Sequence, residues 1–167
     1  MPRENDAEQS SPPLCDAVRR GRGNAAFLAD LQDLYRQADR DLKTCARGEP
    51  RCLGGGVCCR FDLMDHRLMV ATGELALLTQ AAPPGPASPR RCPYQVGPRC
   101  TARSRRPLGC RTFFCGTSSL ARGQELHERY HRTLRDLHER HGVPYLYVEL
   151  TQALAECLPP ELVVFLR

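Results

Sequence analysis

Cysteine dominates the middle of this chain and constrains its fold more than any apolar pattern does. Eight of the ten cysteines lie between positions 45 and 115. Residues 92–115 are also rich in proline, glycine and arginine, and their apolar residues follow neither a helical nor a strand period. Long irregular segments are uncommon inside a compact domain unless something else organises them. A metal held by thiolates would supply that organisation.

Length and composition narrow the class of protein. A chain of 167 residues suits one domain, and 41% hydrophobic residues can form a core. No run approaches the ~18 apolar residues that a transmembrane helix needs. The opening segment MPRENDAEQSSPP has no apolar stretch typical of a signal peptide. We therefore expect a cytoplasmic protein that does not bind membranes, in which thiols serve as ligands or redox groups rather than as a disulfide scaffold.

The sequence predicts two long helices around the cysteine-rich stretch. Residues 1–23 are polar, contain proline and glycine, and predict a flexible N-terminal arm, whereas residues 24–167 are predicted to form one cysteine-cluster metal-binding domain. Apolar residues at helical spacing predict amphipathic helices over 24–46, which Asn24 would cap, and over 124–141.

Shorter elements are predicted between and after these helices. The sequence predicts a hairpin over 60–70, a helix over 73–80, a strand over 145–150 and a helix over 151–157. The expected fold class is α+β: a small single domain, mainly helices plus short strands, with a loop-rich core organised by cysteine–metal ligation.

Seven cysteines are the candidate metal ligands, because thiolates bind soft and borderline metals. Five residues separate Cys52 from Cys58, and gaps of seven, nine and four residues follow Cys92, of which only the last falls within the usual zinc spacing. A gap of four also occurs in plant-type iron–sulfur ligation, so the spacing leaves the metal open. Because the thiols are numerous and irregularly spaced, we favour an iron–sulfur cluster slightly over zinc. The candidates are Cys52, Cys58, Cys59, Cys92, Cys100, Cys110 and Cys115.

These seven thiols exceed the four that one centre needs, so the chain holds either two centres or one centre with spare redox-active thiols. The adjacent Cys58 and Cys59 can serve one site only if the chain turns sharply, which Gly54, Gly55 and Gly56 would allow. Cys15 and Cys157 lie far from the cluster and are interpreted as free thiols.

Positive charge is concentrated beside the cysteines. Residues 88–124 contain eight arginines and no acidic residue. A four-thiolate site carries negative charge that arginine can compensate by donating to sulfur, and we assign this role to Arg106 and Arg111. A solvated surface and a nucleic-acid patch are the alternatives, the latter disfavoured because aromatic residues are few and no recognition helix carries the charge.

The cysteine pattern resembles a known family. The stretch from Cys92 to Cys100, followed by Arg106-Pro-Leu-Gly-Cys-Arg-Thr-Phe-Phe-Cys115, is similar to the YkgJ-type cysteine-cluster (CxxCxxCC) family, described as a zinc- or iron-chelating domain. The resemblance covers about residues 45 to 150, and Gly55 stands where many members have a cysteine. It implies a bound iron–sulfur cluster or zinc. Flagellin lysine N-methylases carry a related cluster, so the resemblance also allows a redox or protein-modifying enzyme.

A second motif competes with the cysteines. His127-Glu128-Arg129-Tyr130-His131 matches the HExxH pattern of zinc peptidases. Arg129 places a charge where such helices are usually uncharged, no third ligand is evident, and the helix is rich in histidine, so a polar helix face is the preferred interpretation. Whether the chain is an enzyme, and whether it acts on a protein or peptide partner, stays open on the sequence.

Overall fold

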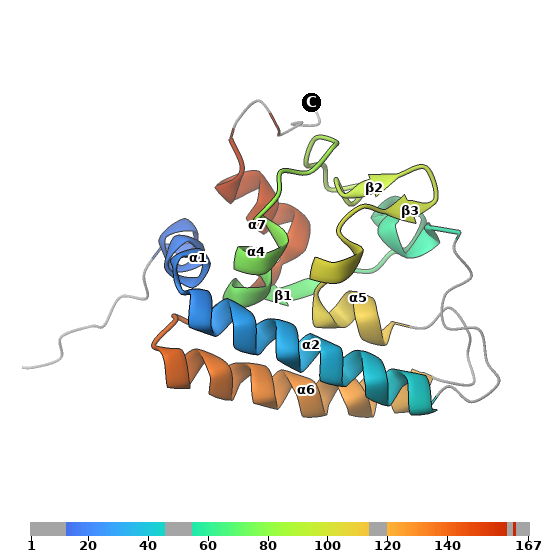
Figure 1. The fold of residues 1–167 in the computed structure, drawn as a ribbon. Helices are drawn as coiled ribbons and strands as arrows, with labels where there is room; N and C mark the ends of the chain where they lie inside the picture. The colour runs from blue at the N-terminus through green and yellow to red at the C-terminus, as the bar shows by residue number, and fades with distance from the viewer. Residues whose placement is uncertain (1–12, 46–54, 114–119, 160–161, 163–167) are drawn as a thin grey trace, which may run out of the picture.

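The computed structural model describes residues 13–45, 55–113, 120–159 and 162. Two predicted ligands, Cys52 and Cys115, lie outside the described residues. The described part is a small, mainly helical domain with two short two-stranded sheets, as the predicted fold class requires (Figure 1). No described helix is long and apolar enough to cross a membrane.

Two long antiparallel helices form one layer of the domain (Figure 1). Helix α2 spans Ala25–Cys45 and α6 spans Leu120–His141, close to both predictions. The Asn24 side chain caps α2 by accepting a hydrogen bond from the Phe27 backbone N–H at 3.0 Å. Helix α6 ends just before Gly142, which adopts a φ of 62°.

The N-terminal part of the domain differs from the expected arm. Residues 14–23 form helix α1 (Leu14–Gly23), which buries Leu14, Ala17 and Val18 against α4 (Thr72–Leu78). The prediction of free thiols outside the cluster is also wrong, because Cys15 and Cys157 form a disulfide with a Cα–Cα distance of 5.3 Å. This bond ties α1 to α7 (Leu150–Cys157).

The prediction of a hairpin over residues 60–70 is wrong. Residues 61–64 form a helical turn, α3 (Phe61–Met64). Strand β1 (Met69–Ala71) pairs antiparallel with the distant strand β4 (Tyr147–Glu149), with Met69 opposite Glu149. Local alternation of apolar residues cannot distinguish a hairpin from one strand with a distant partner, and here the distant partner buries Val70 and Ala71.

The apolar core lies between α2, α4 and α6. Phe27, Leu77 and Leu134 are all fully buried there. Helix α4 is buried along its whole length and carries Glu74, whose carboxylate accepts a hydrogen bond from the Ala71 backbone N–H at 2.9 Å. Thr72, the first residue of this helix, donates its hydroxyl to the Leu146 carbonyl.

Candidate metal centre

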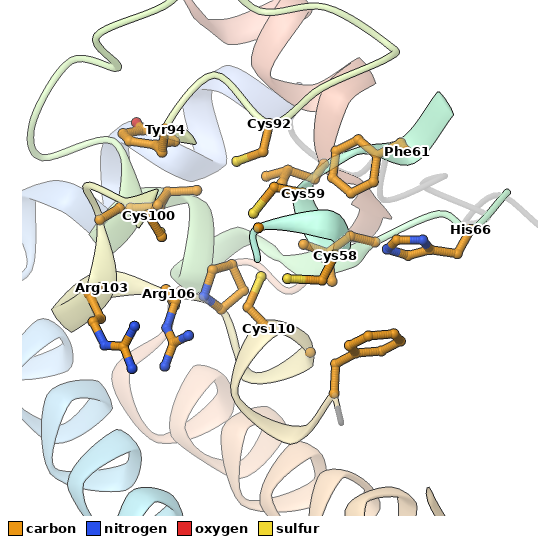
Figure 2. A pocket seen from close by; sticks show the side chains of 18 of the residues that line it. Cys58, Cys59, Phe61, His66, Cys92, Tyr94, Cys100, Arg103, Arg106 and Cys110 are labelled. Carbon is orange, nitrogen blue, oxygen red and sulfur yellow. The ribbon is translucent and has the colours of Figure 1, made fainter. Parts of the chain in front are cut away.

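Five of the predicted ligands line one cavity of about 590 Å³ (Figure 2). They come from four separate segments, and all five are half-buried free thiols. In the view of Figure 2, several of their side chains point toward one another around the centre of the cavity. The fold therefore brings together residues spread over more than fifty positions. The five are Cys58, Cys59, Cys92, Cys100 and Cys110.

A glycine places the adjacent pair. Gly56 has a φ of 66°, and an added Cβ would lie 2.3 Å from the Gln95 side chain and 2.8 Å from the Pro98 carbonyl oxygen. The chain can therefore turn tightly into the helical turn η1 (Val57–Cys59) while Gly56 packs closely against Gln95 and Pro98. The Gln95 side-chain amide fixes this contact by donating to the Gly56 carbonyl at 2.7 Å.

Backbone pairing places the next two thiols. The Cys92 N–H donates to the Cys59 carbonyl at 2.9 Å, which joins the second cysteine segment directly to the first. Strands β2 (Gln95–Val96) and β3 (Arg99–Cys100) then form a small antiparallel hairpin that sets Cys100 opposite Gln95. This hairpin lies within the segment that the sequence predicted to be loops.

The fifth thiol stands on the short helix α5 (Leu108–Thr112), which a buried carboxylate anchors. Glu74 accepts hydrogen bonds from the Leu108 N–H at 2.6 Å and from the Tyr35 hydroxyl at 3.1 Å. Burial raises the pKa of Glu74, against the lowering effect of its donors. One side chain thereby links α2, α4 and the helix that carries Cys110.

The thiols influence one another strongly. A hydrogen bond with Cys59 and burial raise the pKa of Cys58. The Cys58 hydrogen bond lowers the pKa of Cys59, but a hydrogen bond with Cys92 and burial outweigh it and raise that pKa to about 12. Burial also raises the pKa of Cys110, whereas the Arg106 guanidinium lowers it. A metal ion would replace the protons of these thiols, since coordination deprotonates a thiol outright.

The two predicted arginine donors behave differently. Arg106 lines the cavity, it acts electrostatically on Cys58 and Cys110, and its buried Nε has no hydrogen-bond partner among the described residues. Its role as a donor to sulfur stays a prediction, and a buried donor without a hydrogen-bond partner is rare in proteins.

Arg111 does not line the cavity, so the structure corrects its predicted role as a donor to sulfur. Its side chain is only 3% exposed and binds Asp39 at 2.6 Å, the Ser104 carbonyl at 2.7 Å and the Arg106 carbonyl at 2.8 Å. Its guanidinium also lies 4.1 Å from the centre of the Tyr35 ring. Arg111 therefore positions Arg106 through the backbone, because its guanidinium donates to the carbonyls of Ser104 and Arg106.

His66 lines the same cavity and was not among the residues selected from the sequence. Its ring lies against Phe61 edge-on and is stacked on Phe113 at 5.6 Å, and its buried Nδ1 has no hydrogen-bond partner among the described residues. A lone histidine beside an aspartate in an expected turn carries no pattern, so the sequence offered no signal for it.

The competing HExxH motif lies on α6, and neither of its histidines lines the cysteine cavity. The His127 Nδ1 is 3.1 Å from the Thr112 hydroxyl, and the His131 Nε2 is 2.7 Å from the Tyr145 hydroxyl. Burial lowers the pKa of both imidazoles. Each ring thus has a protein partner, an arrangement that favours the interpretation as a structural helix face.

Within the described part of the chain, no three or more His, Cys, Asp or Glu side chains are already grouped as the ligands of a single metal ion. The five thiols are instead spread around the wall of the cavity. Comparison with protein-family models, curated proteins and solved structures gave no match for this chain.

Proposed function

We propose that this chain is a metal-binding protein that holds an iron–sulfur cluster, or alternatively zinc, through thiolates in the segment 52–115. One observation carries the proposal: five cysteines from four segments line a single cavity, with Arg106 beside them. Free cysteines with no common role have no physical reason to converge in this way. The residues present fit such a group, since soft thiolate donors and a compensating guanidinium are the chemistry that it requires.

The size of the cavity supports a cluster over a single ion. Four sulfurs around one zinc ion each lie about 2.3 Å from it and leave little space between them. A polynuclear cluster holds its cysteines farther apart because several iron and sulfide ions lie between them. A cavity of about 590 Å³ has room for the larger group.

Metal and sulfide analysis of protein purified without oxygen tests the proposal. We expect iron and acid-labile sulfide in fixed ratio to the chain, together with broad visible absorption. A colourless protein with stoichiometric zinc would move the assignment to zinc, and a protein with neither metal would contradict the proposal.

Two variants and a matched control assign the ligands. Cys58→Ser and Cys110→Ser are expected to lose most of the metal, because serine does not replace a thiolate on a soft metal. The double variant Cys15→Ser/Cys157→Ser removes the same atoms from the disulfide and is expected to keep the metal content of the unaltered protein.

A second candidate function is a redox or protein-modifying enzyme that uses the cluster. The observation in its favour is that exposed apolar side chains, Val57, Leu63 and Val96, lie on the elements that form the cavity and could meet a protein or peptide partner. Copurification of a peptide substrate or a partner enzyme with the metal-loaded protein is the test.

The cytoplasm is the location we propose, from the cysteine chemistry. The Cys15–Cys157 disulfide counts against it, because cytoplasmic proteins rarely keep structural disulfides. Thiol alkylation of protein in intact cells, followed by mass spectrometry of Cys15 and Cys157, distinguishes the cytoplasm from an oxidising compartment. Alkylated cysteines indicate the cytoplasm, and cysteines protected by the disulfide indicate an oxidising compartment.

A further inference from the structure

The arginines that line the cavity differ from nearby arginines in their side-chain hydrogen bonds. Three other arginines of the same segment are used by the protein: Arg91 donates to Gln95, Arg105 to the Leu78 carbonyl and Arg111 to Asp39. The four that line the cavity donate no side-chain hydrogen bond to any described residue. They are Arg67, Arg99, Arg103 and Arg106.

The charge of the cavity is strongly one-sided. None of its described lining residues is acidic. A zinc ion with four thiolates carries a net charge of about −2, and a four-thiolate iron–sulfur cluster is likewise anionic. About two of the four guanidinium charges would therefore stay uncompensated after the metal is bound. Low-dielectric walls strengthen the attraction of such a site for an anion.

The shape of the cavity favours an organic anion over an inorganic one. Phe61, His66 and Phe113 form one aromatic wall, held together by an edge-on contact and a stacked contact. Figure 2 shows Arg103 and Arg106 on the opposite side of the view from Phe61 and His66, with the thiols of Cys58 and Cys110 between them. The cavity thus offers cations at one side and flat apolar rings at the other. Ligand sites of this size commonly combine a few placed polar groups with apolar walls.

Two buried polar nitrogens support a bound ligand. Arg106 Nε and His66 Nδ1 both belong to residues that line this cavity, and both lack a hydrogen-bond partner among the described residues. Leaving a buried donor or acceptor unpaired is costly, so such atoms indicate groups that a ligand completes. The cavity volume of about 590 Å³ also lies within the range of sites that bind small organic molecules.

We propose that the cavity binds, beside the metal, a small organic anion whose carboxylate or phosphate group pairs with Arg103 and Arg106 and whose apolar body packs against the aromatic wall. This inference rests on the proposed metal-binding function and adds the chemical class of its ligand. Arg67 and Arg99, which are exposed as Arg103 is, add to the positive potential around the cavity.

Calorimetric titration of the metal-loaded protein with four probes tests the inference. Benzoate and phenyl phosphate share a flat apolar body and differ in their anionic group, while acetate and inorganic phosphate lack that body. We expect the first two to bind about tenfold or more tighter than the matching small anions. The stronger of the two identifies the ligand as a carboxylate or a phosphate.

Variants locate the binding. Arg103→Gln and Arg106→Gln are each expected to weaken the better probe about tenfold or more, because each removes a charge-assisted hydrogen bond. Arg132→Gln makes the same change on the exposed surface of α6 and is expected to leave the affinity unchanged. Arg106 also lies beside the thiols, so Arg103→Gln keeps the test valid if Arg106→Gln fails to bind metal.

Several results would overturn the inference. They are no binding of any probe to metal-loaded protein, equal affinity in Arg103→Gln and the unaltered chain, or the same loss in Arg132→Gln, which would indicate a general charge effect. Metal content is measured in the same samples, so a protein that carries metal but binds no probe contradicts this inference alone. A protein without metal contradicts the proposed function, and binding of the probes by that metal-free protein then still tests the cavity.

Discussion

The α2–α6 layer and the cysteine cavity of this domain are held together by different forces. The layer consists of helices of 21 and 22 residues, and its stability comes from fully buried apolar side chains such as Phe27 and Leu134. Most of the cavity wall comes from elements of two to five residues, joined by single polar contacts such as those of Gln95, Glu74 and Arg111.

This contrast indicates which region needs a ligand. Apolar burial is sufficient to hold two long helices together. Short irregular segments bury too little apolar surface to offset the conformational entropy that is lost when they become ordered. A metal bound by several cysteine segments at once, as we propose, would supply this missing free energy at the cavity. Substitutions in each region test this difference between them.

The largest effect is expected in the helical layer. Phe27→Ala removes a fully buried ring and is expected to lower the free energy of unfolding by about 3–5 kcal/mol, measured by chemical denaturation. Leu63→Ala, at a side chain that is 63% exposed near the cavity, is the control and is expected to change it by less than about 0.5 kcal/mol. Equal effects at both sites would remove the distinction between the two regions.

The disulfide is expected to act on the fold and not on the cavity. The bond closes a sequence separation of 142 residues, so Cys15→Ser/Cys157→Ser is expected to cost about 2–4 kcal/mol of stability. Thermal unfolding with and without reductant measures this loss, and the reduced unaltered protein should match the double variant. A simultaneous loss of metal would show that α1 and α7 support the cavity directly.

Arg111 connects the two regions. Arg111→Gln leaves two carbonyls and Asp39 without their donor and is expected to lower the free energy of unfolding by about 1–3 kcal/mol. Because Arg111 positions the segment 104–106, slower reloading of metal is expected as well. Arg132→Gln has the same charge change without these contacts, and an identical result for the two variants would remove Arg111 from the account.

Glu74 gives an effect of the same size as Arg111, and its effect depends on pH. Glu74→Gln replaces one accepting oxygen with an NH₂ group and is expected to cost about 1–3 kcal/mol. Burial raises the folded-state pKa of Glu74 above its ordinary value of 4.5, so the stability from its protonated form is complete below that value. This contribution is lost as the pH rises through the folded-state pKa.

Denaturation curves of Glu74→Gln and the unaltered protein, recorded from about pH 5 to about pH 8, measure this linkage. The advantage of the unaltered protein should shrink as the pH rises. Glu125→Gln, at an exposed position on α6, serves as the control for a general charge effect. A stability difference that grows with pH would mean that Glu74 favours its ionised form in the fold.

The long helices could be predicted because their apolar residues repeat at the helical period over five to six turns. The same period exists in α1, where Leu14, Ala17, Val18 and Gly21 are buried, but the neighbouring prolines and glycines hid it. Strand β1 could not be predicted correctly, since its partner β4 lies far along the chain and local sequence does not identify a distant strand.

Residue types could predict several of the side chains that meet at the cavity, but not how those side chains are arranged. Cys58 and Cys110 were selected because thiolates bind metals, and the fold places both at one cavity. Arg106 and Arg111 lie four positions and one position from Cys110 in sequence, yet the more distant Arg106 lines the cavity and the adjacent Arg111 binds Asp39. Only the path of the backbone distinguishes them, and the same holds for His66.

X-ray absorption at the metal edge of protein purified without oxygen tests the central claim most directly, because it reports the atoms bound to the metal. Thiolate ligation predicts a first shell of sulfur at about 2.3 Å, and a cluster adds a second shell of iron. Cys58→Ser should reduce the sulfur shell, while Cys15→Ser/Cys157→Ser should leave it unchanged. A first shell of oxygen and nitrogen alone, in protein that carries stoichiometric metal, would contradict the account.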